Sequence, residues 1–570
     1  MQCIWDVETN GLKPTQIWCL CAIKGDKMYT LSAPTKEMVE ELFTDVTVHI
    51  GHNLIGYDIP VVERLLDVTI TGHVTDTLIL SRLYNPQLEG GHSLHAWGER
   101  LKFPKGDYHD WTTLTPQMVA YCQQDVKLTQ LVYQQLQSRL VEFGNQSIDL
   151  EHRVQVGITK QIANGWLLDQ RKASDLVATL KEKQYELEEK VQEKFKPLPT
   201  FVKEIVPKYK KDGSLSPVGL KFLGDDWTII GGTFSRVDWP LFNLGSRQQI
   251  GRYLTRFGWE PKTFTETGQA IVDEKVLSGV TDIPEAQLIV EYLTVQKRIA
   301  QVQSWLNAVE SDGRVHGQVN SIGAVTGRMT HSKPNMAQVP ASSASYGSEC
   351  RACWIVPKGH KLVGVDASGL ELRMLAHYMD DQEYTKEILE GDVHTANQEA
   401  AGLPTRPQAK TFIYAFLYGA GDAKIGSIVG GSARQGQELK KKFLDNTPAL
   451  AILRQKVATA APRGYLRALD GRFVWVRSDH AALNTLLQSA GAIIMKKALA
   501  LFLEYAPNWN LRFKLLGSIH DEYQIEAVEK DADKVGYLMV ECIKAAGIAF
   551  DLKCPLNGEY KIGNSWEETH

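Results

Sequence analysis

The chain of 570 residues is long enough for roughly two to four domains with hydrophobic cores of their own. Its composition, 43% hydrophobic and 23% charged, excludes a disordered or fibrous protein and is typical of a soluble globular one. The formal net charge of -4 gives no sign of a nucleic-acid partner, although such binding needs only a local basic groove, and a metal-dependent enzyme carries carboxylates that lower the total.

The eight cysteines are scattered, and Cys350 and Cys353 form one CxxC pair without a second Cys or His pair at zinc-ligand spacing. We therefore expect buried or half-buried free thiols in a reducing compartment rather than a metal or redox site there. Asp6 and Glu8 stand where a signal peptide would need apolar residues, and no run approaches the roughly 18 apolar residues of a membrane span. The sequence predicts a cytoplasmic protein.

Residues 1–145 alternate strand and helix patterns. The segment 3–8 alternates in the manner of a strand and ends at the turn signal Asn10-Gly11. A second strand follows with Trp18, Leu20 and Ala22 on one face, and residues 37–42 and 117–140 have helical periodicity. This order predicts an α/β domain.

The pattern changes after residue 145. Residues 146–195 are helical and charged, which predicts a long two-helix or coiled arm, and residues 195–243 are rich in Pro, Gly and Lys, which predicts an irregular insertion. Helical periodicity returns at 285–306. The remainder mixes strands (361–366 and 523–528) with helices (409–419 and 484–505), and we find no internal repeat.

Two distant segments present carboxylates at the ends of short apolar strands. Residues 361–366 form a strand that ends at Asp366, and residues 515–526 form two strands bent around His520, Asp521 and Glu522. An acidic pair in a hairpin is costly unless a positive charge lies beside it. A pair of Mg²⁺ ions between Asp366 and Asp521 would supply that charge, although each motif by itself is also compatible with an acidic strand end or a solvated turn.

A third segment carries an unusual stripe of side chains. Arg406, Lys410, Tyr414 and Tyr418 recur every four residues, so on a helix all four project from one side. The two cations suit a triphosphate, and the two rings suit stacking on a base. The alternative is a partly buried helix with snorkelling basic residues.

A second acidic cluster is indicated near the N-terminus. Asp6 and Glu8 lie two apart on a predicted strand, so both carboxylates point to one face, where they repel each other unless a cation is present. Asp58 follows in the segment 52–58, and Tyr121 and Asp125 follow in the segment 121–125. The alternative is a set of surface acids on an α/β domain.

These segments resemble known motifs in the same order. The sequences DASGLELR (366–373), R-x3-K-x3-Y-x3-YG (406–419) and HDE (520–522) resemble motifs A, B and C of family A DNA polymerases. Segments 324–331, 391–395, 403–406 and 480–492 are similar to the replicative polymerases of T-seven-like bacteriophages. The N-terminal acids resemble the Exo I, II and III motifs of DEDDy 3′→5′ exonucleases. The resemblance covers most of the chain and weakens between about 180 and 245.

The resemblance implies an α/β multidomain fold, with an N-terminal RNase H-like DEDDy exonuclease domain followed by a right-hand polymerase domain. The implied boundaries are an exonuclease at 1–145, a thumb region at 146–310 with an insertion at about 195–243, palm segments at 311–385 and 480–570, and fingers at 386–479. The implied function is a replicative DNA-directed DNA polymerase with proofreading. It would act in the cytoplasm, that of the host if the chain is phage-encoded.

The resemblance also implies a role for each motif residue. Two Mg²⁺ ions, with Mn²⁺ as an alternative, would be held in the polymerase by Asp366 and Asp521 and in the exonuclease by Asp6, Glu8, Asp58 and Asp125, with Tyr121 orienting the attacking water. The nucleotide would be bound by Arg406 and Lys410 with help from His394 and by Tyr414 and Tyr418, with Lys410 protonating the leaving pyrophosphate and Glu371 acting as steric gate against ribonucleotides. The DNA would be contacted by Arg328, Asn484, Gln488, His520 and Glu522.

Three positions qualify the resemblance. Ser343 stands where the family commonly has an Arg that reads the minor groove, a role that Arg351 or another basic residue would have to take, and His480 stands where many members have Arg. Tyr414 occupies a position at which members with Tyr rather than Phe accept dideoxynucleotides, which implies poor discrimination against chain terminators.

Partners and other functions stay open. In similar phage polymerases a thumb insertion binds host thioredoxin, whereas the stretch here is shorter and its segment 206–213 is basic, so thioredoxin, DNA and a solvated linker are all compatible. A replicative helicase-primase is a further expected partner. The absence of a domain before Met1 favours replication over repair. The alternatives are a nuclease with a catalytically weak polymerase half, and a non-enzymatic single-strand-binding replisome protein.

Overall fold

The structure, a computed structural model, describes residues 1–224 and 231–570 and forms two compact units. Unit 1 comprises Met1–Leu168, Ala308–Ser342 and Gly347–His570, and unit 2 comprises Asp169–Asn307 and Ser343–Tyr346. The predicted thumb boundary at residue 146 stays a prediction. Unit 2 begins at residue 169, because helix α6 (Asn145–Asn164) packs within unit 1 against helix α19 (Ala482–Tyr505). The division of the polymerase part into palm and fingers stays a prediction.

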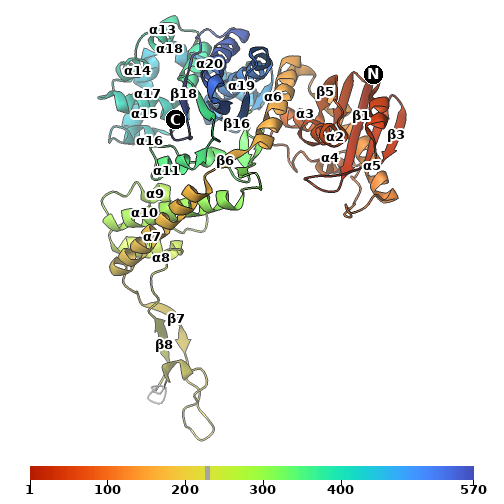
Figure 1. Cartoon of the computed structure of the whole chain (residues 1–570). Coiled ribbons are helices and arrows are strands. Elements are labelled where there is room, and N and C mark those ends of the chain that lie inside the picture. Colours follow the sequence, from red (N-terminus) through yellow and green to blue (C-terminus); the bar gives the residue numbers. More distant parts are fainter. Residues whose placement is uncertain (225–230) are drawn as a thin grey trace. The chain divides into compact units, whose positions relative to one another are not determined.

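A five-stranded sheet in the order β3-β2-β1-β4-β5 forms the N-terminal part of unit 1 (Figure 1). Its strands are β1 (Gln2–Thr9), β2 (Ile17–Lys24), β3 (Lys27–Ser32), β4 (Val48–Gly51) and β5 (His73–Asp76). Strands β1, β2 and β3 pair antiparallel, whereas β1, β4 and β5 pair parallel. The helices are α1 (Lys36–Phe43), α2 (Ile59–Leu66), α3 (Thr77–Tyr84), α4 (Leu94–Leu101) and α5 (Pro116–Arg139). The predicted α/β order is confirmed.

The alternation along β1 separates two cores. Cys3, Trp5 and Val7 pack on the side covered by α1 and α2, and Ile4 packs on the other side, which α5 covers. Helix α5 begins at Pro116 after the Thr115 side chain, which accepts a hydrogen bond from the backbone of the first turn. Asp6 and Glu8 share the face of Ile4 because strand residues two apart point the same way.

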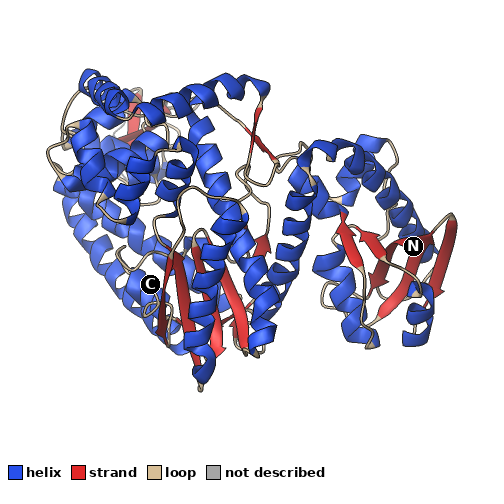
Figure 2. Ribbon diagram, turned by 90° about the horizontal axis from the view of Figure 1, so that it is seen from above, coloured by secondary structure: helices blue, strands red, loops and turns tan. Residues whose placement is uncertain are grey.

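The second half of unit 1 is built on a four-stranded antiparallel sheet in the order β16-β17-β13-β18, with helices around it (Figure 2). These strands are β13 (His360–Ala367), β16 (Phe513–Ile519), β17 (Glu522–Val528) and β18 (Gly558–Gly563). Smaller sheets are made by β6 (Trp166–Leu168), β9 (Arg314–Val315) and β12 (Trp354–Ile355), by β10 (Gln318–Asn320) and β11 (Thr330–Ser332), and by β14 (Tyr465–Arg467) and β15 (Phe473–Trp475). The predicted strands 361–366 and 523–528 are confirmed.

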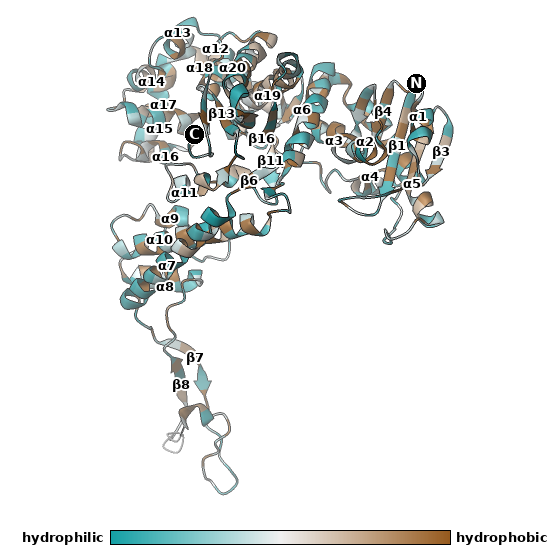
Figure 3. Ribbon diagram, viewed as in Figure 1, coloured by the Kyte–Doolittle hydropathy of each residue, from teal (hydrophilic) through white to brown (hydrophobic). Residues whose placement is uncertain are grey.

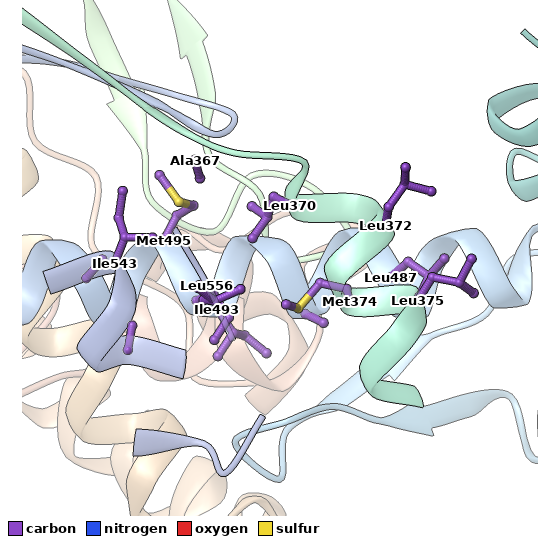
Figure 4. Packing of buried hydrophobic residues seen from close by; sticks show 14 of the residues in the cluster. Ala367, Leu370, Leu372, Met374, Leu375, Leu487, Ile493, Met495, Ile543 and Leu556 are labelled. Atoms are coloured by element: carbon purple, nitrogen blue, oxygen red, sulfur yellow. The ribbon is translucent and has the colours of Figure 1, made fainter. Parts of the chain in front are cut away.

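One large core joins this sheet to its helices. Leu370, Met374 and Leu375 of the helix after β13 pack in the same cluster as Leu487 and Ile493 of α19 (Figure 4). The helices of this part are α11 (Gly347–Ala352), α12 (Leu370–Met379), α13 (Gln382–Leu389), α14 (Val393–Ala401), α15 (Arg406–Leu417), α16 (Asp422–Ser427), α17 (Ala433–Asn446), α18 (Pro448–Ala460) and α20 (Ala532–Ala549). The predicted helices 409–419 and 484–505 are confirmed to within three residues at their ends.

Helix α19 corrects one expectation from the sequence. The helical stretch Asp479–Trp509 is long and apolar enough to cross a membrane by length and composition, which the sequence analysis had not found for any run. However, 83% of its apolar window is buried inside the protein, where it supplies much of the core. Its apolar character is therefore explained by burial in a globular unit.

Unit 2 is mainly helical. Its helices are α7 (Gln170–Lys194), α8 (Arg247–Arg256), α9 (Glu274–Leu277) and α10 (Pro284–Asn307). Helix α7 packs along α10, with Leu180, Leu187 and Val295 in their shared core. The predicted two-helix arm of residues 146–195 is thus wrong in its pairing: α6 and α7 are helices as expected, but they belong to different units because each buries its apolar face against a different partner.

The predicted irregular insertion at 195–243 contains regular structure. Strands β7 (Thr200–Ile205) and β8 (Phe234–Asp238) pair antiparallel, and hydrophobic and hydrophilic residues lie side by side on this hairpin (Figure 3). Residues 225–230 of the insertion lie outside the described residues. The β-branched and aromatic residues of the two strands, such as Phe201, Val202 and Val237, outweigh the Lys and Gly content on which the prediction rested.

A buried charge cluster joins helix α6, helix α19 and the turn between β14 and β15 in unit 1. Glu151 of α6 accepts hydrogen bonds from Lys496 of α19 at 2.6 and 2.8 Å and from Arg472, which also binds Asp470. All four side chains are at most 3% exposed. Burial lowers the pKa of Lys496 to about 8, which the Glu151 carboxylate offsets only in part. Glu151 therefore neutralises the buried Lys496 and shares the neutralisation of Arg472 with Asp470.

We expect Glu151→Gln to lower the free energy of unfolding of the protein by about 3–5 kcal/mol, because removing one partner of a buried pair leaves an uncompensated buried charge. Urea unfolding followed by circular dichroism measures this. Lys36→Met, which removes an exposed pair with Asp67, is the control and should leave stability unchanged within error. Equal effects of the two substitutions would contradict the role of Glu151.

Candidate active sites

Four carboxylates converge on one cavity in the N-terminal part of unit 1. Asp6 and Glu8 lie on β1, Asp58 lies directly before α2, and Asp125 lies on α5. All four line a cavity of about 470 Å³, together with Tyr121. The residues predicted from the sequence as a second acidic cluster are therefore brought together by the fold.

The proximity of these acids is electrostatically unfavourable. Burial, and then the Asp125 carboxylate, raises the pKa of Asp6 to about 8, and burial with the Asp6 charge raises the pKa of Glu8 to about 10. Burial and Asp6 likewise raise the pKa of Asp58 well above its usual value. Burial raises the pKa of Asp125 only to about 6, because the Lys105 ammonium opposes it.

Lys105 is a candidate functional residue that the sequence analysis missed. Its ammonium lies 2.7 Å from Asp125 Oδ2 and 4.9 Å from the centre of the Tyr121 ring. The Tyr121 ring also contacts Tyr108 and Trp111, with centroids 5.9 and 5.8 Å away. A cation could have been expected beside four acids, but the sequence gives no sign of which basic residue reaches them.

The donor set of this cavity fits divalent cations. Asp125 Oδ1 is buried and has no hydrogen-bond partner within the described ranges 1–224 and 231–570. Carboxylate oxygens are the ligands that Mg²⁺ and Mn²⁺ prefer, and a cation would relieve the repulsion that raises these pKa values. Asp6, Glu8, Asp58 and Asp125 are the residues that could hold it.

A second acidic site forms at one end of the four-stranded sheet. Asp366 of β13 lies opposite Glu522 of β17, and the backbone N–H of Ala367 donates to the carbonyl of Asp521 at 3.0 Å. This register brings Asp366 and Asp521 next to each other, although 154 residues of sequence separate them. Burial, and then the charges of Asp521 and Glu522, raises the pKa of Asp366 to about 7. A divalent cation would again relieve the repulsion.

Glu522 is held by internal partners. Its carboxylate accepts hydrogen bonds from Trp566 at 2.8 Å and Gln524 at 2.6 Å and contacts the His570 ring at 3.2 Å. Burial would raise its pKa, but the hydrogen bonds, that of His570 first, hold the pKa below its usual value. Glu522 is therefore a buried anion, and its predicted contact with a primer terminus stays a prediction. His520 is exposed in the turn, with φ of 57°.

The predicted stripe of cations begins at the first turn of α15. The Arg406 guanidinium donates two hydrogen bonds to Asp392, at 2.5 and 3.2 Å, and holds the pKa of that carboxyl well below its usual range. Asp392 also accepts a hydrogen bond from the backbone of His394, whose ring lies 6.3 Å from that of Tyr414. Lys410 is exposed one turn after Arg406. The structure thus adds Asp392 as a partner that positions Arg406.

The stripe continues past the end of α15. Tyr418 follows the last helical residue, and its ring lies 6.4 Å from that of Tyr414, so the two rings are neighbours as predicted. The Tyr418 hydroxyl donates to Glu371 at 2.9 Å, and Arg328 contacts the other Glu371 oxygen at 3.2 Å. This bridge from Arg328 through Glu371 to Tyr418 could not be found from sequence, because the three residues lie in separate motifs.

The remaining predicted residues are placed as follows. Asn484 and Gln488 lie one turn apart on the half-buried side of α19. Ser343 is exposed and belongs to unit 2. The alternative role of Arg351 is not supported, because its side chain is 5% exposed, donates to the carbonyl of Pro340 at 2.8 Å and stacks on the Trp566 ring.

Comparison with known proteins agrees with this geometry. A family model described as DNA polymerase family A matches residues 233–568. The DNA-directed DNA polymerases of Enterobacteria phage T3 and Escherichia phage T7 are each 36% identical to this chain, over 92% of it and 92% of their own length. The POL domain of Pol1 from M. smegmatis, solved in complex with DNA primer-template and dNTP, has a TM-score of 0.80 at 19% identity and covers 99% of this chain and 96% of its own.

The matches also confirm the predicted fold class, an N-terminal RNase H-like domain followed by a right-hand polymerase domain. The family model spans motifs A, B and C, and the two phage polymerases align with the N-terminal part as well. The chain belongs to DNA polymerase family A.

Proposed function

We propose that this chain is a replicative DNA-directed DNA polymerase that also degrades DNA from the 3′ end, so that it proofreads its own product. The observation that carries the proposal is the presence of two separate carboxylate clusters, one around Asp366 and Asp521 and one around Asp6 and Glu8. Each cluster has raised pKa values that a cation would lower. The proposed substrates are primer-template DNA and deoxynucleoside triphosphates, and the proposed place of action is the cytoplasm.

In the polymerase site, the chain's residues would bind and orient the reactants. Family A polymerases use divalent metal ions, and ions held by Asp366 and Asp521 would activate the primer 3′-hydroxyl and stabilise the pyrophosphate that leaves. Arg406 and Lys410 would bind the triphosphate, and Lys410 would protonate the departing pyrophosphate. Asp392 would keep the Arg406 guanidinium oriented by its two hydrogen bonds.

Selection of the sugar would depend on the bridge around Glu371. Because Tyr418 and Arg328 hold both oxygens of this carboxylate, Glu371 cannot move aside without losing two hydrogen bonds. A rigid side chain at this position would exclude a 2′-hydroxyl, which favours DNA synthesis over RNA synthesis. Arg328, Asn484, Gln488 and His520 would contact the template-primer duplex.

In the exonuclease site, Tyr121 would orient the water that attacks the terminal phosphodiester, and Lys105 would balance the charge of Asp125 until the site is loaded. Asp6, Glu8, Asp58 and Asp125 would hold the ions. The alternative of a nuclease with an inactive polymerase half is not favoured, since Asp366, Asp521, Lys410 and Arg406 are all present.

The hairpin of unit 2 is the proposed contact for a processivity partner or for DNA. Phe201, Tyr209 and Trp239 are exposed there beside lysines such as Lys208 and Lys210. Exposed rings among cations suit either a protein surface or phosphates. A pull-down with thioredoxin and a processivity assay with and without it decide between the two, and the same assays with a helicase-primase test that partner.

We expect Asp366→Asn and Asp521→Asn each to reduce primer extension by roughly a thousandfold, because each removes several kcal/mol of charge stabilisation at the ion-binding site. The measurement is extension of a labelled hairpin primer with Mg²⁺ and all four nucleotides. Asp445→Asn, an exposed acid on α17, is the matched control. Extension that survives either substitution would remove the basis of the proposed polymerase site.

We expect Asp6→Ala combined with Glu8→Ala to abolish degradation of the primer in the absence of nucleotides and to leave extension intact. The reason is that only the N-terminal cavity loses its ion ligands. Glu40→Ala, an exposed acid on α1, serves as control. If the double substitution stopped extension as well, the proposal of two independent active sites would be contradicted.

We expect the unaltered chain to incorporate dideoxynucleotides nearly as well as deoxynucleotides, and Tyr414→Phe to discriminate against them by roughly 10- to 100-fold. The phenol hydroxyl would replace the missing 3′-hydroxyl in a hydrogen bond to the charged triphosphate, which contributes about 1.5–3 kcal/mol. The ratio of kcat/KM values for the two nucleotides reports this. A strong preference for deoxynucleotides that Tyr414→Phe leaves unchanged would refute the role of the hydroxyl.

A further inference from the structure

Three buried cysteines converge beside the carboxylate pair of the N-terminal cavity. Cys19 and Cys21 of β2 lie directly opposite Glu8 and Asp6 in the antiparallel register of β1 and β2, so all four side chains share one face of the sheet. Cys122 lies on α5, which covers this face. The three Sγ atoms lie within 4.8 Å of one another, and all three residues are fully buried.

The thiol cluster touches the acids directly. Cys122 Sγ lies 3.5 Å from the Asp6 carbonyl oxygen and 3.8 Å from Asp6 Oδ2. Cys122 also forms a second group with the Asp6 and Glu8 carboxylates, again with all ligand atoms within 4.8 Å. The contact of the Cys21 thiol with the Val119 carbonyl is long, at 3.9 Å. Cys122 therefore belongs to both groups and joins the three thiols to the carboxylates of Asp6 and Glu8.

A metal ion with tetrahedral coordination fits this arrangement. With metal–sulfur bonds of about 2.3 Å, the sulfurs of such a site lie about 3.8 Å apart. This separation is compatible with the three Sγ atoms, which all lie within 4.8 Å of one another. A buried cysteine in an ordinary core packs as a small apolar residue instead, as Cys3 does on the opposite face of β1. The difference is that Cys19, Cys21 and Cys122 lie against one another and that Cys122 also contacts the Asp6 carboxylate.

We propose that Cys19, Cys21 and Cys122 bind one thiophilic divalent cation of the Zn²⁺ or Cd²⁺ kind, with an Asp6 carboxylate oxygen as the fourth ligand. Binding converts three thiols to thiolates and releases their three protons to solvent, and no oxidation or reduction is involved. The cavity of about 470 Å³ is lined by Asp6 but not by the three buried cysteines, so an ion from the cavity would have to pass Asp6 to reach them.

This site would compete with the hard-cation site for Asp6. An ion bound to the three thiolates would draw the Asp6 carboxylate away from Glu8, Asp58 and Asp125, and a displacement of about 1 Å in an active site costs roughly a hundredfold in rate. This consequence rests on the proposed exonuclease function: the thiophilic ion would stop primer degradation and leave synthesis unaffected, because Asp366 of β13 and Asp521 of the turn between β16 and β17 belong to a different sheet.

The binding test uses the full-length chain and Cd²⁺ alone, in the absence of nucleotides and DNA. We expect one Cd²⁺ per chain, with a cadmium–thiolate charge-transfer absorbance that is preserved in Cys3→Ala and lost in Cys122→Ala and in Cys19→Ala combined with Cys21→Ala. As a second measurement on the unaltered chain, Cd²⁺ should protect these three buried cysteines from alkylation at a urea concentration at which they are alkylated without Cd²⁺, as mapped by mass spectrometry. Absence of the absorbance and of the protection would overturn the proposal, as would equal absorbance in all variants.

The activity test compares the unaltered chain with Cys122→Ala in Mg²⁺. We expect micromolar Cd²⁺ to reduce primer degradation about a hundredfold in the unaltered chain, with little effect on Cys122→Ala or on extension by either protein. Equal inhibition of both proteins would overturn the competition for Asp6. The two proposals fail separately: if no degradation occurs with Mg²⁺ alone, the exonuclease assignment is lost, whereas the absorbance and alkylation measurements still decide the thiol site.

Discussion

The repulsion between carboxylates that the backbone holds together is the constraint on which both sites depend. In the polymerase site the hydrogen bond from the Ala367 N–H to the Asp521 carbonyl closes the end of the β13–β17 ladder and leaves Asp366 beside Asp521. In the N-terminal site the Val7 N–H donates to Asp58 and ties it to the strand that carries Asp6 and Glu8. Without a cation, both arrangements disfavour ionisation, which is why the pKa values of these acids are raised. The strand register therefore favours the binding of cations, because it holds the carboxylates close together.

The same register has a second effect in the N-terminal sheet. Because β1 and β2 are antiparallel neighbours, the residues opposite Asp6 and Glu8 share their face, and these residues are Cys21 and Cys19. The hard oxygen ligands and the soft sulfur ligands are thus adjacent, and the contact between Asp6 and Cys122 joins the two sets. The choice of ion at this point would follow from ligand softness rather than from the position of the acids alone.

Helix α6 connects these features within unit 1. His152 accepts a hydrogen bond from the backbone of Asp76, whose carboxylate in turn accepts from the backbone N–H groups of Asn53 and Ile55, shortly before Asp58. On the adjacent position of the helix, Glu151 neutralises the buried Lys496 of α19. Helix α6 therefore supports the segment that carries Asp58 and also the core helix of the polymerase part. Its buried side chains His152 and Glu151 have hydrogen-bond partners on these two sides.

The sequence by itself determined the element types, the order of the motifs and the acids that form each cluster, because period-2 and period-3.6 patterns and short spacings such as Asp6 to Glu8 are local properties. The tertiary structure alone decided the strand register that joins Asp366 to Asp521, the pairing of α7 with α10, the hairpin within 195–243, and the partners Lys105, Asp392 and Cys122. Each of these depends on contacts between residues far apart in the chain. Such contacts produce no local sequence pattern from which they could be predicted.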